Sequence, residues 1–133
     1  MWRLVGRVAN FKEGDEPKRV MLQSDVEDGW SVRRDTPLGP VLIRRIEHEN
    51  FQVFSGICPH LGCSVGVDKG KDRFMCPCHK SAFSPDGERL ELEGASNPSP
   101  RGLDPLAWRV VDGQLEVEWV RYETGTPDRL PLG

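Results

Sequence analysis

All four cysteines of the chain and two of its three histidines fall within two short stretches, residues 58–63 and 76–81. The first reads Cys-Pro-His-Leu-Gly-Cys and the second reads Cys-Pro-Cys-His-Lys-Ser. Thiolates and imidazoles are the side chains that bind soft and borderline metal ions. The strongest constraint that this sequence sets is therefore that the fold must bring both stretches together around one metal centre.

The remainder of the chain predicts an all-β fold. No segment of helical length carries a 3.6-residue apolar repeat, and 14 glycines and 11 prolines interrupt the chain. An Asp-Gly pair at residues 112–113 and a polar stretch at residues 47–50 predict hairpin turns. Runs rich in β-branched and aromatic residues predict strands at residues 19–22, 41–46, 51–54, 106–111 and 115–120.

The length of 133 residues indicates a single domain. The predicted strands up to residue 54 and those after residue 103 flank the two cysteine stretches. We therefore expect a base, about residues 1–54 and 95–133, with an inserted cluster-binding subdomain at about residues 55–94. Residues 124–133 are rich in proline and glycine, which indicates a loosely attached terminus.

Charge and hydropathy exclude some classes of partner. The net charge is −3 and the basic residues are scattered among the acids, which argues against binding to nucleic acid. Acids such as Asp104 are interpreted as solubility features. The longest apolar runs, such as residues 40–43, are far shorter than the roughly 18 residues of a membrane span. We expect membrane association only through an anchor missing from this sequence or through partner subunits.

Each cysteine stretch offers one cysteine–histidine pair, Cys58 with His60 and Cys76 with His79, and one further cysteine. This donor set fits a [2Fe–2S] cluster in which two histidines replace two cysteines on one iron. Two ferric ions, two sulfides and two thiolates sum to a charge of about zero, against about −2 with four thiolates, so the cluster accepts an electron more easily.

Two other interpretations fit the same residues less well. Zinc ligands usually come as cysteine pairs two to four residues apart, whereas Cys-x-His and Cys-x-x-His pairs with surplus cysteines occur here. A framework made only of disulfides leaves both histidines unexplained.

The two stretches resemble the ligand loops of the Rieske iron–sulfur family. The surplus cysteine pair is similar to that of the Rieske subunits in quinol–cytochrome c oxidoreductases, the cytochrome bc complexes. Residues 97–103, Asn-Pro-Ser-Pro-Arg-Gly-Leu, resemble the proline loop of that family. The likeness extends from about residue 41 onward and implies the Rieske fold, an antiparallel β-sandwich base with a small cluster-binding subdomain.

The resemblance also implies a role for individual residues. It implies that Cys63 and Cys78 form a disulfide, and that His60, His79 and Leu61 face the quinol at the docking tip. It implies that Ser81 donates its hydroxyl toward a cluster sulfur. The cluster ligands that it implies are Cys58, His60, Cys76 and His79.

Two residues near the expected cluster depart from the family pattern. Lys80 stands where glycine is usual, and Phe83 stands where many high-potential members have a tyrosine that donates to a ligand sulfur. Loss of that hydroxyl lowers the reduction potential and favours a lower-potential donor such as menaquinol. The positive charge of Lys80 offsets part of the effect.

The function that the resemblance implies is electron transfer in a respiratory chain. The expected partners are quinol, a cytochrome b subunit and a c-type cytochrome or equivalent acceptor, at the periplasmic or outer face of a bacterial cytoplasmic membrane. Oxidoreductase activity would belong to the assembled complex rather than to this chain alone.

Two alternative functions remain at this stage. The Rieske small subunits of arsenite-oxidase-type molybdenum enzymes can share the extra cysteine pair and the pattern of Ser81 and Phe83, although residues 97–103 favour the cytochrome bc complex. A soluble Rieske ferredoxin is less favoured, because such proteins normally lack the disulfide cysteines.

Overall fold

The computed structural model describes residues 2–14, 17–27, 32–68, 73–78, 80–91 and 97–132, with the backbone alone at residues 24–27 and 32–37. Within these ranges the chain forms nine β-strands and one 3-10 turn, η1 (Val8–Asn10). Every strand pairing between them is antiparallel. The expected all-β class is confirmed.

The first sheet pairs a strand near the start of the chain with strands near its end. It holds β1 (Trp2–Arg7), β9 (Gln114–Glu118) and β8 (Trp108–Val111), in the order β1-β9-β8. The hairpin between β8 and β9 turns at Asp112 and Gly113, whose φ angles are 50° and 74°. Two successive positive φ angles are the requirement of a type I′ turn, which explains why the Asp-Gly pair predicts this hairpin.

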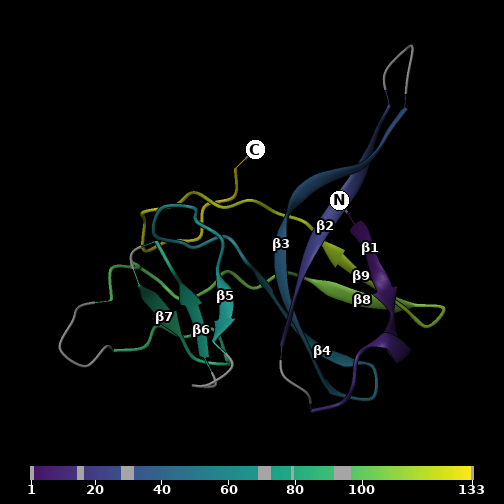
Figure 1. The fold of residues 1–133 in the computed structure, drawn as a ribbon, viewed down its shortest axis with the longest axis horizontal. Helices are drawn as coiled ribbons and strands as arrows, with labels where there is room; N and C mark the ends of the chain where they lie inside the picture. The colour runs from purple at the N-terminus through teal and green to yellow at the C-terminus, as the bar shows by residue number, and fades with distance from the viewer. Residues whose placement is uncertain are drawn as a thin grey trace.

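The second sheet is a meander of consecutive strands. It holds β2 (Lys18–Glu27), β3 (Val32–Glu47) and β4 (Asn50–Ser55). The far ends of β2 and β3 extend as a long hairpin beyond the remainder of the fold (Figure 1).

The base core lies between these two sheets, because its buried side chains come from both of them. Alternate residues of β9, Leu115 and Val117, point inward, as the apolar alternation of that strand predicts. The buried members of this core are Val8, Phe11, Leu22, Val41, Ile43, Phe51, Val53, Leu106, Leu115 and Val117.

The third sheet is smaller and lies to one side of the base (Figure 1). It holds β5 (Gly66–Asp68), β6 (Arg73–Cys76) and β7 (Ser81–Phe83), and these follow β4 and precede β8 in the chain. It has its own core of Leu42, Phe54, Cys58, Val65, Phe74, Cys76, Phe83 and Leu103. The bounds of the inserted subdomain, 55–94, stay a prediction, because residues 92–96 lie outside the described ranges.

The C-terminal segment corrects the expectation of a loosely attached terminus. Backbone hydrogen bonds from Glu123 N to Leu130 O and from Leu132 N to Arg121 O, each 2.8 Å long, fold the segment back on itself. A further 2.8 Å bond runs from Gly125 N to Pro59 O. In Figure 1 the segment, drawn in yellow, passes beside the loop that follows β4.

Across the described residues, we find no helix of the length and hydrophobicity that a membrane crossing needs.

Candidate metal centre

The first ligand loop, residues 56–65, connects β4 to β5 and is closed by its own backbone. Cys58 N donates to Cys63 O at 2.7 Å, and Gly62 N donates to Cys58 O at 2.9 Å. At its start, Gly56 N donates to Pro40 O of β3 at 2.8 Å. The cysteines of this loop are therefore held close together and fixed to the base.

The second ligand loop connects β6 to β7, with Cys76 and Ser81 paired across the ends of the two strands. Lys80 has a φ of 59°, in the left-handed region that glycine adopts without strain. This conformation accounts for the glycine that the family resemblance leads us to expect at that position. His79, an expected ligand, lies outside the described residues.

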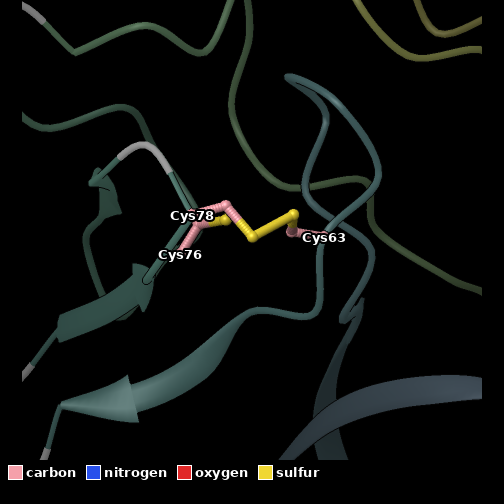
Figure 2. Close-up of side chains that lie close together, drawn as sticks. All are labelled: Cys63, Cys76 and Cys78. Atoms are coloured by element: carbon pink, nitrogen blue, oxygen red, sulfur yellow. A yellow bond between two sulfur atoms is a disulfide. The ribbon is translucent and has the colours of Figure 1, made fainter.

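A disulfide between Cys63 and Cys78 joins the two loops, with a Cα–Cα distance of 6.5 Å (Figure 2). The expected pairing is confirmed. Figure 2 shows Cys76 beside this bridge, and the sulfur atoms of Cys63, Cys76 and Cys78 all lie within 4.8 Å of one another. Because disulfide sulfurs are not thiolates, Cys63 and Cys78 do not serve as metal ligands in this state.

The thiols of Cys58 and Cys76 are free and buried. Burial raises the pKa of the Cys58 thiol above its ordinary value, and the neighbouring Cys76 thiol raises it further. The backbone of His60 hydrogen-bonds to Cys58 and opposes this rise. The two thiols form a compact pair of soft donors, and metal binding to them would release their protons.

Ser81 supplies an independent test of whether a metal–sulfur cluster fits. Its side chain is fully buried, and its Oγ has no hydrogen bond of normal geometry within the described part of the chain. The hydroxyl nevertheless lies close enough to Cys58 to lower the pKa of that thiol. Buried polar groups normally have a hydrogen-bond partner, so a buried hydroxyl in this position is explained if a further acceptor, such as a cluster sulfide, binds beside the two free thiols.

The remaining expected site residues differ in exposure. Leu61 is 58% exposed and His60 is partly exposed, so both face outward from the first loop. Lys80 is also exposed. Phe83 is fully buried in the same core as Cys58 and Cys76.

Residues 97–104 connect the small sheet to the base. The Asn97 side chain donates to Ala82 O at 2.7 Å and to Leu90 O at 2.8 Å. At the other end, Ser55 N of β4 donates to Asp104 O at 2.8 Å. This segment therefore fixes the orientation of β7, which begins with Ser81.

The sequence did not reveal a buried ion pair within this segment. Arg101 and Asp104 are 5% and 3% exposed and form two N–O contacts of 2.8 Å each. Asp104 is thus part of the interior, and its interpretation as a solubility feature is wrong. No spacing motif marks such a pair, because its partners meet through the fold of a loop rather than through a regular element.

Comparisons with known proteins agree with this geometry. The sequence model of the Rieske [2Fe-2S] domain matches residues 1–106. The menaquinol:cytochrome c reductase iron-sulfur subunit of Geobacillus thermodenitrificans is 31% identical over 112 residues, which are 81% of this chain and 63% of that protein. The cytochrome b6-f complex iron-sulfur subunit of Gloeobacter violaceus is 42% identical over 57 residues, which are 43% of this chain and 28% of that protein.

Among solved structures, the plasma membrane Rieske protein PetC3 of Synechocystis PCC 6803 superposes with a TM-score of 0.53 at 24% identity, over 87% of this chain and 98% of that one. This likeness shows the fold. The chain spans less than two thirds of the length of the two curated relatives named above. The match of the family over most of the chain, together with the two bridged loops, shows that this chain belongs to the Rieske [2Fe-2S] domain family.

Proposed function

We propose that this chain is the cluster-bearing domain of the iron–sulfur subunit in a quinol-oxidising complex of the cytochrome bc type. The relative that covers most of the chain is named as a menaquinol:cytochrome c reductase iron-sulfur subunit. The observation that carries the proposal is the disulfide between the two ligand loops. Soluble ferredoxins that serve oxygenases normally lack these two cysteines.

The proposed ligands are Cys58 and Cys76 on one iron and His60 and His79 on the other. The two free, buried thiols of the described site supply the sulfur half of this set. When bound, a cluster of this type supplies a one-electron acceptor at about −150 to +300 mV, against about −400 mV for plant-type ferredoxins.

The outward face of the first ligand loop is the proposed quinol contact. His60 is partly exposed beside Leu61, so an apolar side chain and an imidazole lie together at the surface. In the proposed arrangement the imidazole nitrogen of His60 or His79 that is not bound to iron accepts a hydrogen bond from the quinol hydroxyl. The same nitrogen would take up the proton of the quinol hydroxyl as the electron passes from the quinol to the cluster.

The proposed donor is menaquinol rather than a higher-potential quinol. Phe83 carries no hydroxyl in the buried core beside the ligand cysteines. Ser81 would then donate toward a cluster sulfur without a second hydroxyl from residue 83, and fewer hydrogen bonds to sulfur give a lower reduction potential. The exposed ammonium group of Lys80 offsets part of this decrease.

We propose a c-type cytochrome or equivalent as the acceptor and a location at the periplasmic or outer face of the cytoplasmic membrane. A structural disulfide persists in oxidising compartments, which supports that side of the membrane.

The reduction potential and its dependence on pH test this proposal. We expect an EPR-monitored titration to give a potential that falls as the pH rises above neutrality, because proton uptake accompanies reduction. A potential of about −150 mV without pH dependence would contradict quinol oxidation and favour an oxygenase ferredoxin. Reduction by an arsenite-oxidising molybdenum subunit, but not by menaquinol with the cytochrome b subunit, would favour the molybdenum enzyme.

A further inference from the structure

The C-terminal segment, residues 121–132, forms a compact strap on the surface of the molecule. Backbone hydrogen bonds between Glu123 and Leu130 and between Leu132 and Arg121 close it on itself. The strap lies outside residues 1–106, which match the family, so it is not part of what defines a Rieske domain.

The strap contacts the first ligand loop at the residues around His60. Gly125 N donates to Pro59 O at 2.8 Å. A Cβ atom at Gly125 would lie 3.6 Å from His60 O, and one at Gly62 would lie 3.9 Å from the Thr124 methyl group. The strap therefore packs along the backbone of residues 59–62.

Arg101 connects the strap to the interior. Two of its nitrogens bind the Asp104 carboxylate, and its third nitrogen donates to Thr126 O at 2.8 Å and lies 3.4 Å from Asp128 O. Arg129 of the strap adds a 3.2 Å ion pair to the same carboxylate. One planar guanidinium group thus binds a buried carboxylate and strap carbonyls at the same time, which the point charge of lysine cannot reproduce.

The first ligand loop is restrained by other segments at Cys63 and at Pro59. Its own hydrogen bonds, between Cys58 and Cys63 and between Gly62 and Cys58, close the turn. The disulfide holds the loop at Cys63, which is one end of the turn. The bond from Gly125 to Pro59 restrains the opposite side of the same turn.

We propose that the strap, anchored by Arg101, holds the first ligand loop in place and so sets the orientation of His60. Arg101 is in this view a positioning residue that acts on the loop through Thr126 and the strap. The claim that the loop sets the orientation of His60 rests on the proposed function, in which His60 binds iron. The claim that Arg101 and the strap hold the loop does not depend on that function.

Two variants test the proposal, and a third is the control. Arg101→Lys keeps a positive charge beside Asp104 but loses the guanidinium nitrogens that bind the carboxylate and the strap carbonyls at the same time. A chain that ends at Glu123 removes the part of the strap that contacts the loop and Arg101, from residue 124 onward, and retains Tyr122, which packs against the base core. Arg45→Lys is the matched control, because Arg45 also donates to backbone carbonyls of a distant segment, Val8 O and Phe11 O, but in the base.

Amide hydrogen exchange and EPR spectroscopy of the protein as purified are the measurements. We expect exchange of residues 58–63 to increase at least tenfold in the shortened chain and to increase in Arg101→Lys, while β3 and β4 exchange as in the wild type. We also expect a changed EPR spectrum of the reduced protein in both variants. The control should change neither exchange at residues 58–63 nor the spectrum.

Unchanged exchange at residues 58–63 in a folded, shortened chain would overturn the proposal. Faster exchange with an unchanged EPR spectrum would overturn the assignment of His60 orientation to the strap. If the wild type gave no Rieske-type EPR signal at all, the proposed function would fail, and the exchange data would still decide whether the strap holds the loop.

Discussion

Loss of the disulfide between Cys63 and Cys78 should destabilise the fold without removing the proposed metal ligands. The bridge joins residues 15 apart in sequence. The chain-entropy relation gives about 3 kcal/mol for closing a loop of about this length in the unfolded chain. At about 4 °C per kcal/mol for a domain of this size, the double variant Cys63→Ala, Cys78→Ala should melt about 12 °C below the wild type.

Thermal unfolding followed by circular dichroism measures this difference, and dithiothreitol provides the control. Cys78 is exposed and Cys63 is partly exposed, so a reductant can reach the bridge. Reductant should lower the melting temperature of the wild type to that of the double variant and should leave the variant unchanged. Equal melting temperatures for the oxidised wild type and the double variant would refute the reasoning, because the bridge would then contribute nothing to holding the two loops together.

Three further substitutions test the reduction potential, the stability of the fold and the proposed docking surface. Phe83→Tyr adds a hydroxyl within the core that holds the proposed ligands Cys58 and Cys76, and should raise the reduction potential in an EPR-monitored titration; an unchanged potential would exclude a hydrogen bond to the sulfur of either cysteine. Gly102→Ala places a Cβ atom 2.5 Å from a backbone oxygen and should cost about 1–3 kcal/mol in urea unfolding, whereas Gly66→Ala, with open space around it, should cost less. Leu61→Asp should weaken binding to the proposed partner, a cytochrome b subunit, in a pull-down titration, whereas Leu4→Asp, at a similarly exposed site in the base, should not; equal losses would place the contact elsewhere.

The sequence predicts those parts of the structure that depend on local pattern. The hairpins β3–β4 and β8–β9 join neighbours in the chain, and their turns and apolar alternation are visible in short windows. The two ligand loops are visible for a different reason, because the chemistry of a metal centre requires particular side chains at close spacing. The disulfide followed from the family resemblance.

The parts that sequence reasoning missed depend on contacts between distant residues. Strand β1 pairs with β9, more than a hundred residues later, and no local pattern marks that partnership. The short strands β5, β6 and β7 offer only three or four residues each for a periodic pattern. The C-terminal segment looked loosely attached because its composition suits a loop, whereas backbone hydrogen bonds and the side chain of Arg101 hold it.

The central claim is that two thiolates and two imidazoles hold the [2Fe–2S] cluster. Pulsed EPR of the reduced protein tests it most directly, because nitrogen nuclei bound to iron modulate the electron spin echo. The account predicts couplings from two imidazole nitrogens, with one of them lost in a His60 variant and the other in a His79 variant. A cluster signal without nitrogen couplings would show that neither imidazole binds iron and would contradict the account.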